Sequence, residues 1–316
     1  MQEESTPTIV HTALSSAIAG FIARIPCHPL DTVKARLQGF DGHRYKGLFN
    51  CVKLTLREEG VLGFYRGFGA VASFGPSAAC LYFTSYEAIK QNLHTESTHL
   101  APAVHLLAGL GAEAVACIIF VPVDVVKERL QVQHKMITDS TQVPAATRPA
   151  NALPQYAGSW DALRIIARSE GPLALYAGYA ATLASFGPFS ALYFAFYEQA
   201  RHLVGWMQGA TEGSQKLPAW GTMLSSAAAG ALAGVITSPI DLAKLRLQTQ
   251  PRLRPGEVAP EGHLTGVMDA LRRVFAESGT RGLFRGATAR VAFHVPSTCI
   301  SFTCFEECRK VVQKIV

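Results

Sequence analysis

A pattern that occurs three times along the chain limits the possible folds more than any other feature of the sequence. Each copy has Pro, Asp, Lys, Arg, Leu and Gln at the same offsets, and the copies begin at Pro29, Pro122 and Pro239. A second pattern, in which Glu follows an aromatic residue and precedes Lys or Arg by three positions, also occurs three times, beginning at Tyr86, Tyr197 and Phe305. Two different patterns in the same order indicate an internal triplication. We expect repeats at residues 1–99, 100–212 and 213–316.

Long apolar segments lie between these patterns. Residues 67–86, 171–197 and 217–240 contain no Asp, Glu, Lys or Arg, and each segment is long enough for the roughly 20 residues that cross a bilayer. Three weaker segments are residues 5–25, 101–123 and 291–305. Charged residues make up 16% of the chain, against about 25% in a soluble domain. We therefore predict an all-α membrane protein with six transmembrane helices. The alternative is a large soluble enzyme with buried helices.

The distribution of charge indicates topology. Lys and Arg exceed Asp and Glu by 29 to 23, and the excess lies mainly in the loops after the first, third and fifth spans, so these loops should share one side of the membrane. There is no basic patch interleaved with exposed aromatic residues, so we expect no nucleic-acid partner. The N-terminus has neither an Arg-rich amphipathic helix nor a secretory segment, so we expect any targeting signal to be internal.

We find no motif of an enzyme or a metal site. The sequence lacks the phosphate-binding Gly-x-x-x-x-Gly-Lys and the metal-binding His-Glu-x-x-His, and its seven cysteines form no Cys-x-x-Cys pair. Residues 109–114 superficially fit a dinucleotide fingerprint but lie within a span. We interpret their glycines, like Gly230 and Gly234, as sites of close helix packing. We expect no enzymatic activity, cofactor or bound metal.

The first pattern also predicts a gate. Its Asp and Lys are three residues apart and lie near one face of a helix, so three copies around a pseudo-threefold axis can close a ring of ion pairs. A charge at membrane depth costs roughly 2.5 to 3.5 kcal/mol unless it is paired or hydrated, which suits a ring that pairs in one state and is hydrated in another. Each Pro should kink its helix at the same depth. The second pattern offers the same chemistry at the opposite ends of the spans.

These patterns resemble the signature of the mitochondrial carrier family, and the resemblance covers essentially the whole chain. In that family the first pattern is followed, after a loop, by an acidic residue and Gly, and then by an aromatic residue, Lys or Arg, and Gly. Here this second part reads Glu59-Gly60 with Tyr65-Arg66-Gly67, Glu170-Gly171 with Tyr176-Ala177-Gly178, and Ser278-Gly279 with Phe284-Arg285-Gly286. The second repeat lacks the basic residue, and the third carries Glu277 one position early.

The resemblance implies a six-helix barrel that moves a small molecule across the mitochondrial inner membrane by alternating access. In the matrix gate, Asp31, Asp124 and Asp241 would pair with Lys127, Lys244 and Lys34, respectively. Gln38, Gln131 and Gln248 would brace these pairs. In the cytoplasmic gate, Glu87, Glu198 and Glu306 would pair with Arg201, Arg309 and Lys90. The resemblance also implies matrix helices around residues 48–56, 162–166 and 268–275. Residues 133–156 are rich in Thr, Ala and Pro, a composition typical of a flexible insertion. We also expect a monomer with a membrane lipid such as cardiolipin as a partner.

By the same resemblance, substrate contacts lie on the even spans, three and two residues before a central Pro. The positions are Ser73, with Phe74 competing for its place, Ser185 with Phe186, and Phe293 with His294. Apart from a protonated His294, none of these residues is charged, which argues against anionic substrates that need Arg or Lys at this level. Three other ionisable residues could face the cavity: Arg24, Glu113 and Arg290. Glu113 either binds substrate or pairs with Arg24 or Arg290 to hold helices together.

Finer resemblances point to two substrates. Residues 111–122 resemble the third span of the S-adenosylmethionine carriers, in which an acid also precedes the Pro by nine residues, and a carboxylate with nearby Phe rings suits a cation. Residues 290–301 resemble the sixth span of the mitoferrin iron carriers, although the His of the mitoferrin second span is Ala78 here. His294, Cys80 and Cys299 could contact a soft metal. We predict a carrier of S-adenosylmethionine or another cationic or zwitterionic metabolite, with iron transport as the alternative. A channel or a non-transporting membrane protein is the alternative from another class.

Overall fold

The described part of this chain consists of helices and the short segments that connect them. A computed structural model describes residues 22, 24–93, 101–133, 155–208, 218–253 and 262–300, and these residues contain no strand. The chain divides into two compact units. The larger unit comprises Thr32–Pro188 and Thr237–Gly286, and the smaller comprises Met1–Asp31, Phe189–Ile236 and Ala287–Val316. Each unit takes residues from all three repeats.

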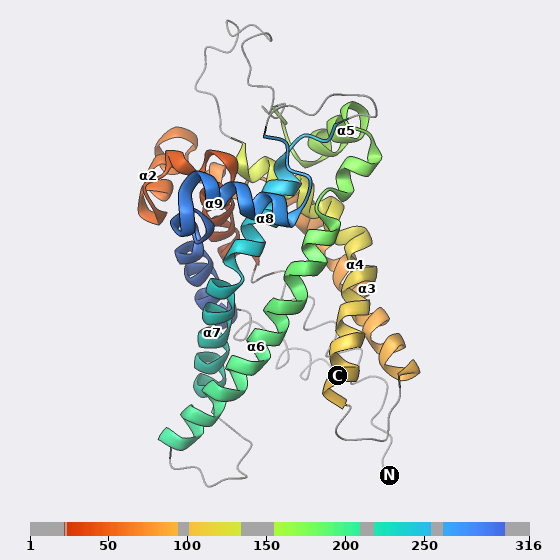
Figure 1. The fold of residues 1–316 in the computed structure, drawn as a ribbon, viewed down its shortest axis with the longest axis vertical. Helices are drawn as coiled ribbons and strands as arrows, with labels where there is room; N and C mark the ends of the chain where they lie inside the picture. The colour runs from red at the N-terminus through yellow and green to blue at the C-terminus, as the bar shows by residue number, and fades with distance from the viewer. Residues whose placement is uncertain are drawn as a thin grey trace, which may run out of the picture. The chain divides into compact units, whose positions relative to one another are not determined.

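The long helices overlap the predicted spans (Figure 1). They are α3 (Phe68–Asn92), α4 (Ala101–Val132), α6 (Tyr179–Met207) and α7 (Ala219–Ile236), together with residues 24–38 and 287–300. Most of the predicted first span, residues 5–25, lies outside the described residues. Among the described helices, residues 107–132 of α4 and all of α7 are long and apolar enough to cross a membrane.

One sequence-based expectation about the spans was wrong in detail. The apolar run at residues 171–197 does not begin as a transmembrane helix, because Gly171 and Gly178 have φ of 88° and 74° and enclose the 3-10 helix η4 (Pro172–Tyr176). The three prolines also differ from one another. Residues 24–38 and α4 stay helical through Pro29 and Pro122, whereas the helix before Pro239 is interrupted at Thr237 and continues as α8 (Ser238–Thr249).

Short helices follow the odd spans, as expected. In the first repeat η1 (Phe40–Arg44), α2 (Leu48–Glu59) and η2 (Val61–Tyr65) precede α3; in the second and third repeats the corresponding helices are α5 (Ser159–Ser169) and α9 (Val267–Leu283), the latter kinked at Gly279. Within the larger unit, α2, α5 and α9 lie at the same end of the long helices (Figure 1). The charge distribution predicted that the loops after the first, third and fifth spans share one side of the membrane, and the short helices of these loops do lie at one end.

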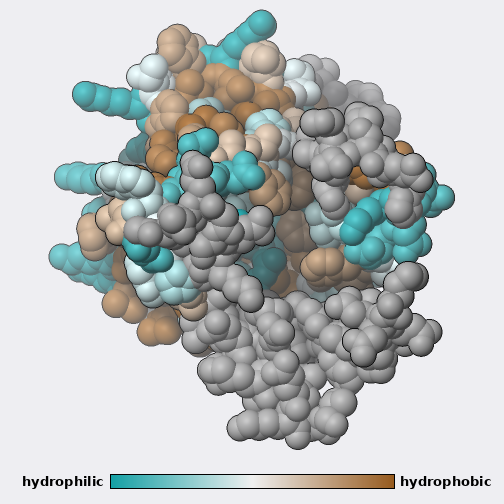
Figure 2. Space-filling model, turned by 90° about the horizontal axis from the view of Figure 1, so that it is seen from below, coloured by the Kyte–Doolittle hydropathy of each residue, from teal (hydrophilic) through white to brown (hydrophobic). Residues whose placement is uncertain are grey.

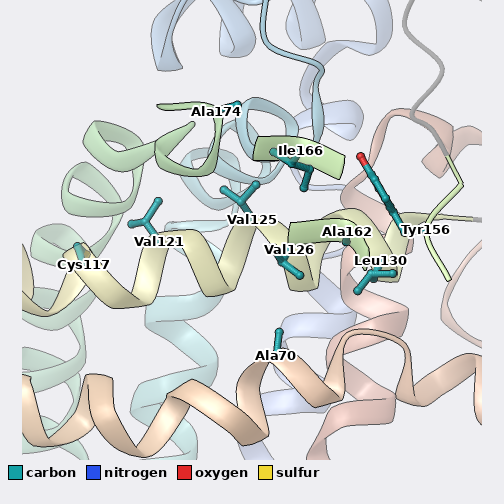
Figure 3. Packing of buried hydrophobic residues seen from close by; sticks show 10 residues of the cluster. All are labelled: Ala70, Cys117, Val121, Val125, Val126, Leu130, Tyr156, Ala162, Ile166 and Ala174. Carbon is teal, nitrogen blue, oxygen red and sulfur yellow. The ribbon is translucent and has the colours of Figure 1, made fainter. Parts of the chain in front are cut away.

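A tight apolar cluster joins α5 to the long helices (Figure 3). Val121 and Val125 project from α4 toward the side on which Ala174 and Ile166 lie, while Ala70 approaches α4 from α3. Ala162 and Ile166 are both fully buried, and their spacing of four residues places them on one face of α5. The opposite face carries Trp160, which is exposed. This amphipathic pattern explains why α5 lies across the span and does not continue it.

Large apolar side chains are also exposed on the long helices. Brown, hydrophobic atoms are visible at the surface in Figure 2. Exposed residues of this kind on α3, α4, α6 and α7 include Phe83, Ile118, Phe194, Leu224 and Leu232. An apolar surface of this kind is unfavourable in water but suits contact with lipid tails.

Glycines at the start of α3, before α6 and after α9 allow each repeat to approach the next. Gly67, Gly178 and Gly286 all have positive φ. A Cβ added to Gly67 would lie 2.9 Å from the carbonyl oxygen of Lys127, and one added to Gly178 would lie 2.8 Å from Cγ of Gln248. At Gly286 it would lie 2.7 Å from Cγ of Gln38. The first repeat thus contacts the second, the second the third, and the third the first.

This geometry predicts a difference between two glycine substitutions in the first repeat. Gly60→Ala should lower stability by roughly 1 to 3 kcal/mol, because essentially only glycine adopts its φ of 71° with ψ of −168°, but no atom lies near the added Cβ. Gly67→Ala should lower it by at least about 1 kcal/mol more, because the Lys127 backbone must also move. Melting temperatures of the purified variants in one detergent test this order, and equal values would contradict the close approach.

Candidate functional site

The charged residues of the first pattern meet across repeats in the larger unit. Lys34 Nζ lies 2.8 Å from Asp241 Oδ2, and Lys244 Nζ lies 2.7 Å from Asp124 Oδ2. These are two of the three pairs expected from the sequence. The side chains of the Lys34 pair are 18% and 13% exposed, so water can reach them.

The third lysine has different neighbours within its own unit. Lys127 Nζ lies 3.2 Å from Glu128 Oε1 and 3.8 Å from Asp124 Oδ1. Glu128 is buried and has no counterpart in the other repeats, which carry Ala35 and Leu245 at this offset. The expected partner of Lys127, Asp31, belongs to the smaller unit, so that pair stays a prediction.

The three glutamines of the pattern are fully buried beside these charges. Gln248 Nε2 donates to Asp124 Oδ2 at 3.3 Å, and Gln131 Nε2 donates to Thr32 Oγ1 at 3.1 Å. Gln38 packs against Gly286. Gln248 thus contacts an acid of the Lys244 pair directly, while Gln131 binds the residue that follows Asp31.

A set of ion pairs that the sequence analysis missed lies next to these residues. Arg36 and Arg129, the arginines of the first pattern, pair with the acid that precedes Gly in the second part of the signature. Arg36 Nη2 lies 2.8 Å from Glu59 Oε1, and Arg129 binds both carboxylate oxygens of Glu170 at 2.5 and 2.9 Å. The sequence contains a signal for these pairs, because the arginine and the acid occur at matching positions in the first and second repeats.

The same arginines also bind the following repeat. Arg36 Nε donates to the carbonyl of Gln131 at 3.0 Å, and Arg129 Nε donates to the carbonyl of Gln248 at 3.1 Å. Burial alone would lower the pKa of Arg36, but the hydrogen bond and charge of Glu59 outweigh it and raise the pKa above its usual value. In the second repeat, which has Ala177 in place of a basic residue, the backbone N–H of Arg252 donates to Glu170 at 2.6 Å.

The described residues of the second pattern lie on both units. Lys90 Nζ sits over the Tyr86 ring at 5.9 Å, and the Arg201 guanidinium sits over the Tyr197 ring at 5.8 Å. Glu87 and Glu198 are exposed. Glu306 and Arg309 lie outside the described residues. The expected cytoplasmic pairs therefore stay predictions.

The expected substrate contacts of the larger unit differ in their surroundings. Ser73 and Phe74 line a pocket of about 430 Å³ between α3, α4 and α5, where the rings of Phe74 and Trp160 are 5.6 Å apart. Ser185 is buried and Phe186 is half-buried. Glu113, also half-buried, accepts a hydrogen bond from Cys117 Sγ at 3.6 Å. Phe74 is thus placed against a short helix.

The remaining candidates lie in the smaller unit. The His294 ring stacks on Phe189 at 5.4 Å, and the buried Arg290 guanidinium sits 5.7 Å from the centroid of the same ring. Gly234 and Gly230 of α7 pack against His294, in line with their interpretation as packing residues. Phe293 makes an edge contact with His294, and Arg24 is exposed. No group of three or more potential metal ligands occurs among the described residues.

Comparison with known proteins identifies the family. The family described as "Mitochondrial carrier protein" matches residues 5–97, 98–208 and 215–316. This chain belongs to the mitochondrial carrier family. The resemblance drawn from the motifs is therefore confirmed, as are the all-helical three-repeat fold and a multi-pass location in the inner mitochondrial membrane. Members of the family are transporters that bind small-molecule substrates.

Similar carriers differ in the substrate that their names state. A mitochondrial S-adenosylmethionine carrier protein of Xenopus tropicalis is 32% identical over 88% of this chain and 87% of its own length. A mitochondrial citrate transporter C of Aspergillus niger is 31% identical over 91% and 86%. Mitoferrin-1 of Mus musculus is 28% identical over 95% and 82%. Similarity alone therefore leaves the substrate of this chain undetermined.

The Lys244–Asp124 pair predicts non-additive mutations. Lys244→Gln and Asp124→Asn should each lower the melting temperature, because each leaves a mostly buried charge without its nearest partner. The double variant should recover part of the loss, with a coupling free energy of about 1 to 3 kcal/mol. Urea unfolding of the four proteins in detergent measures this coupling, and additive losses would show that the two side chains do not interact.

The arginine pairs predict a contrast between repeats. Glu170→Gln should lower stability by about 3 to 5 kcal/mol, because it leaves the fully buried Arg129 charge unpaired. Glu277→Gln should change it by about 1 kcal/mol or less, because Glu277 is 63% exposed and 3.8 Å from Arg246. The same unfolding assay serves for both, and similar losses would rule out the asymmetry.

Proposed function

We propose that this chain carries a small cationic or zwitterionic organic metabolite by alternating access, with S-adenosylmethionine as the first candidate. The observation that carries the proposal is the position of Glu113. This carboxylate lies within α4, nine residues before Pro122, at membrane depth. An acid at such depth needs a charged or hydrated partner, and a cationic substrate would provide one.

The surroundings of Glu113 support this role. Among the described residues of its own unit, its carboxylate forms no ion pair, and its hydrogen bond comes from a thiol, which is a weak donor. The hydroxyl of Tyr179 donates to the carbonyl of Ala114, one residue away, at 2.6 Å. Arg24 and Arg290, the structural partners considered for Glu113, belong to the smaller unit. A helix-bridging pair with either arginine remains the competing role.

The charges of the first pattern support alternating access. Lys34 and Asp241, like Lys244 and Asp124, come from different repeats, so their pairing ties helices together at one end. Opening that end requires the pairs to separate and be hydrated. A second gate from Glu87, Lys90, Glu198, Arg201, Glu306 and Arg309 would close the opposite end. Paired gates at two ends favour a carrier over a channel, which needs a continuous open path.

Iron transport is the alternative substrate proposal. It is supported by the resemblance of residues 290–301 to mitoferrins and by His294, a possible ligand for a soft metal. Its stacking on Phe189 and its packing against Gly230 and Gly234 give His294 a structural role as well. Iron uptake that depends on His294 would favour this alternative.

A membrane lipid such as cardiolipin is a proposed partner of the monomeric carrier. The pocket between α3, α4 and α5 is lined mainly by apolar residues, among them Ile119, Val123 and Leu163. Its volume of about 430 Å³ is within the range of sites that hold small apolar groups. An acyl chain fits this chemistry better than a polar metabolite does.

Substitution of Glu113 tests the substrate class. Glu113→Gln should lower uptake of S-adenosylmethionine into proteoliposomes at least about tenfold, because the cationic sulfonium loses its counter-charge. The control is Glu58→Gln, which removes an acid that pairs with Arg44 on the surface and should leave uptake unchanged. Melting temperatures of both variants show whether each remains folded.

Two outcomes would contradict the proposal. Unchanged uptake by a folded Glu113→Gln protein would assign Glu113 a structural role. Wild-type protein that takes up ferrous iron or citrate, but not S-adenosylmethionine, would overturn the substrate class. In the iron case, loss of uptake in His294→Ala would identify the mitoferrin-like alternative.

A further inference from the structure

The third repeat departs from the first in the way its arginines are neutralised. In the first repeat the Glu59 carboxylate lies between two guanidinium groups, 2.8 Å from Arg36 and 3.0 Å from Arg66. Its side chain is 1% exposed. One buried carboxylate therefore serves two buried or half-buried cations and joins the end of α2 to the helix at residues 24–38.

The corresponding carboxylate is displaced in the third repeat. Ser278 precedes Gly279 as Glu59 precedes Gly60, so a hydroxyl takes the position of the acid. The neighbouring Glu277 is 63% exposed, and its oxygen lies 3.8 Å from Arg246 Nη1. The Arg246 side chain is itself only 12% exposed. A mostly buried guanidinium thus depends on a solvated carboxylate at the edge of ion-pair distance.

Arg285 adds a second positive charge at this position, since it corresponds to Arg66 of the first repeat. Burial lowers the pKa of Arg246, and repulsion from Arg285 lowers it further, against the attraction of Glu277. The net direction is opposite to that of Arg36, whose pKa is raised by Glu59. The first and third repeats therefore have equivalent pairs of arginines, but the pair in the third repeat has less negative charge beside it.

Phe40 closes one side of the same position. Its ring lies 5.3 Å from the Arg246 guanidinium carbon, a distance at which the ring face attracts the cation. Phe40 is eleven residues after Pro29, an offset at which the other repeats carry Gln133 and Gln250. The ring supports the guanidinium plane without neutralising its charge, which leaves the N–H donors of Arg246 available.

We propose that the third repeat binds a small oxyanion, a phosphate or a carboxylate, between Arg246 and Arg285. The oxyanion takes the place that the Glu59 carboxylate holds between Arg36 and Arg66. Guanidinium groups suit this ligand because their paired N–H donors match the spacing of carboxylate and phosphate oxygens. Arg129 shows this geometry in the second repeat, where it binds both oxygens of Glu170.

The site is distinct from the proposed transport pathway. It is formed by α8, the end of α9 and Phe40, at the end of the larger unit where α2, α5 and α9 lie (Figure 1). The oxyanion joins α8 to the segment after α9, as Glu59 joins the corresponding elements of the first repeat through Arg36 and Arg66. Its binding stabilises the contact of the third repeat with the first, and it does not depend on which substrate is carried.

An exchange of two neighbouring residues tests the site without a change in net charge. In the double variant Glu277→Ser with Ser278→Glu, the acid moves to the position that Glu59 has in the first repeat. Melting temperatures are measured in neutral detergent with inorganic phosphate and with chloride at equal ionic strength. Phosphate should raise the melting temperature of the wild type by about 2 °C or more. The exchanged protein should melt higher in chloride and should not respond to phosphate.

A single substitution covers the case in which the exchanged protein does not fold. Arg246→Gln should abolish the phosphate shift, whereas Arg281→Gln, which removes an exposed arginine of α9, should keep it. A parallel arm replaces free phosphate by nanodiscs with and without an acidic phospholipid. Stabilisation by free phosphate identifies a soluble anion, and stabilisation by the acidic lipid alone identifies a headgroup. A wild type stabilised by neither, or a shift that persists in Arg246→Gln, would overturn the proposal.

Discussion

The buried arginine of the first pattern holds two repeats at once, and the rest of the larger unit depends on it. Arg36 binds Glu59 of its own repeat and the carbonyl of Gln131 in the next. Arg129 does the same with Glu170 and Gln248. A buried guanidinium without partners is strongly destabilising. The helix that carries the arginine is therefore stable in its position only when both partners of the arginine are in place. These partners are the acid at the end of the following short helix and the carbonyl at the end of the first-pattern helix in the next repeat.

The glycines that precede α3, α6 and the helix at residues 287–300 also hold neighbouring repeats together. Gly67 lies against Lys127 and Gly178 against Gln248, so the backbone of one repeat touches the pattern of the next where the arginine also binds. The third repeat retains the glycine contact through Gly286 and Gln38 but has a weaker arginine pair. Close packing and charge pairing are therefore separable. All three repeats share the glycine contact, whereas only the first two share the buried arginine–glutamate pair.

Much of this could be predicted from the sequence, because repeated patterns report a repeated environment. The partners of Lys34 and Lys244 and the positions of the short helices follow from the resemblance to the family signature. The start of α6 could not be predicted from apolar content, because hydropathy does not register the two positive-φ glycines around η4. The ion pair of Arg36 with Glu59 was missed because the Asp and Lys of the first pattern already gave that pattern a function as a gate. The contact of Phe74 with Trp160 depends on how α5 packs, which no local pattern encodes.

The two sets of ion pairs differ in a way that fits alternating access. The Lys34–Asp241 side chains are 18% and 13% exposed, whereas those of Arg36 and Glu59 are 0% and 1% exposed. Water already reaches the lysine pair, so it can replace each partner when the pair separates. Separating the arginine pair would leave two charges in a dry environment. Under the proposed mechanism, the lysine pairs therefore open and close, while the arginine pairs keep each short helix attached to its odd span as the repeats move.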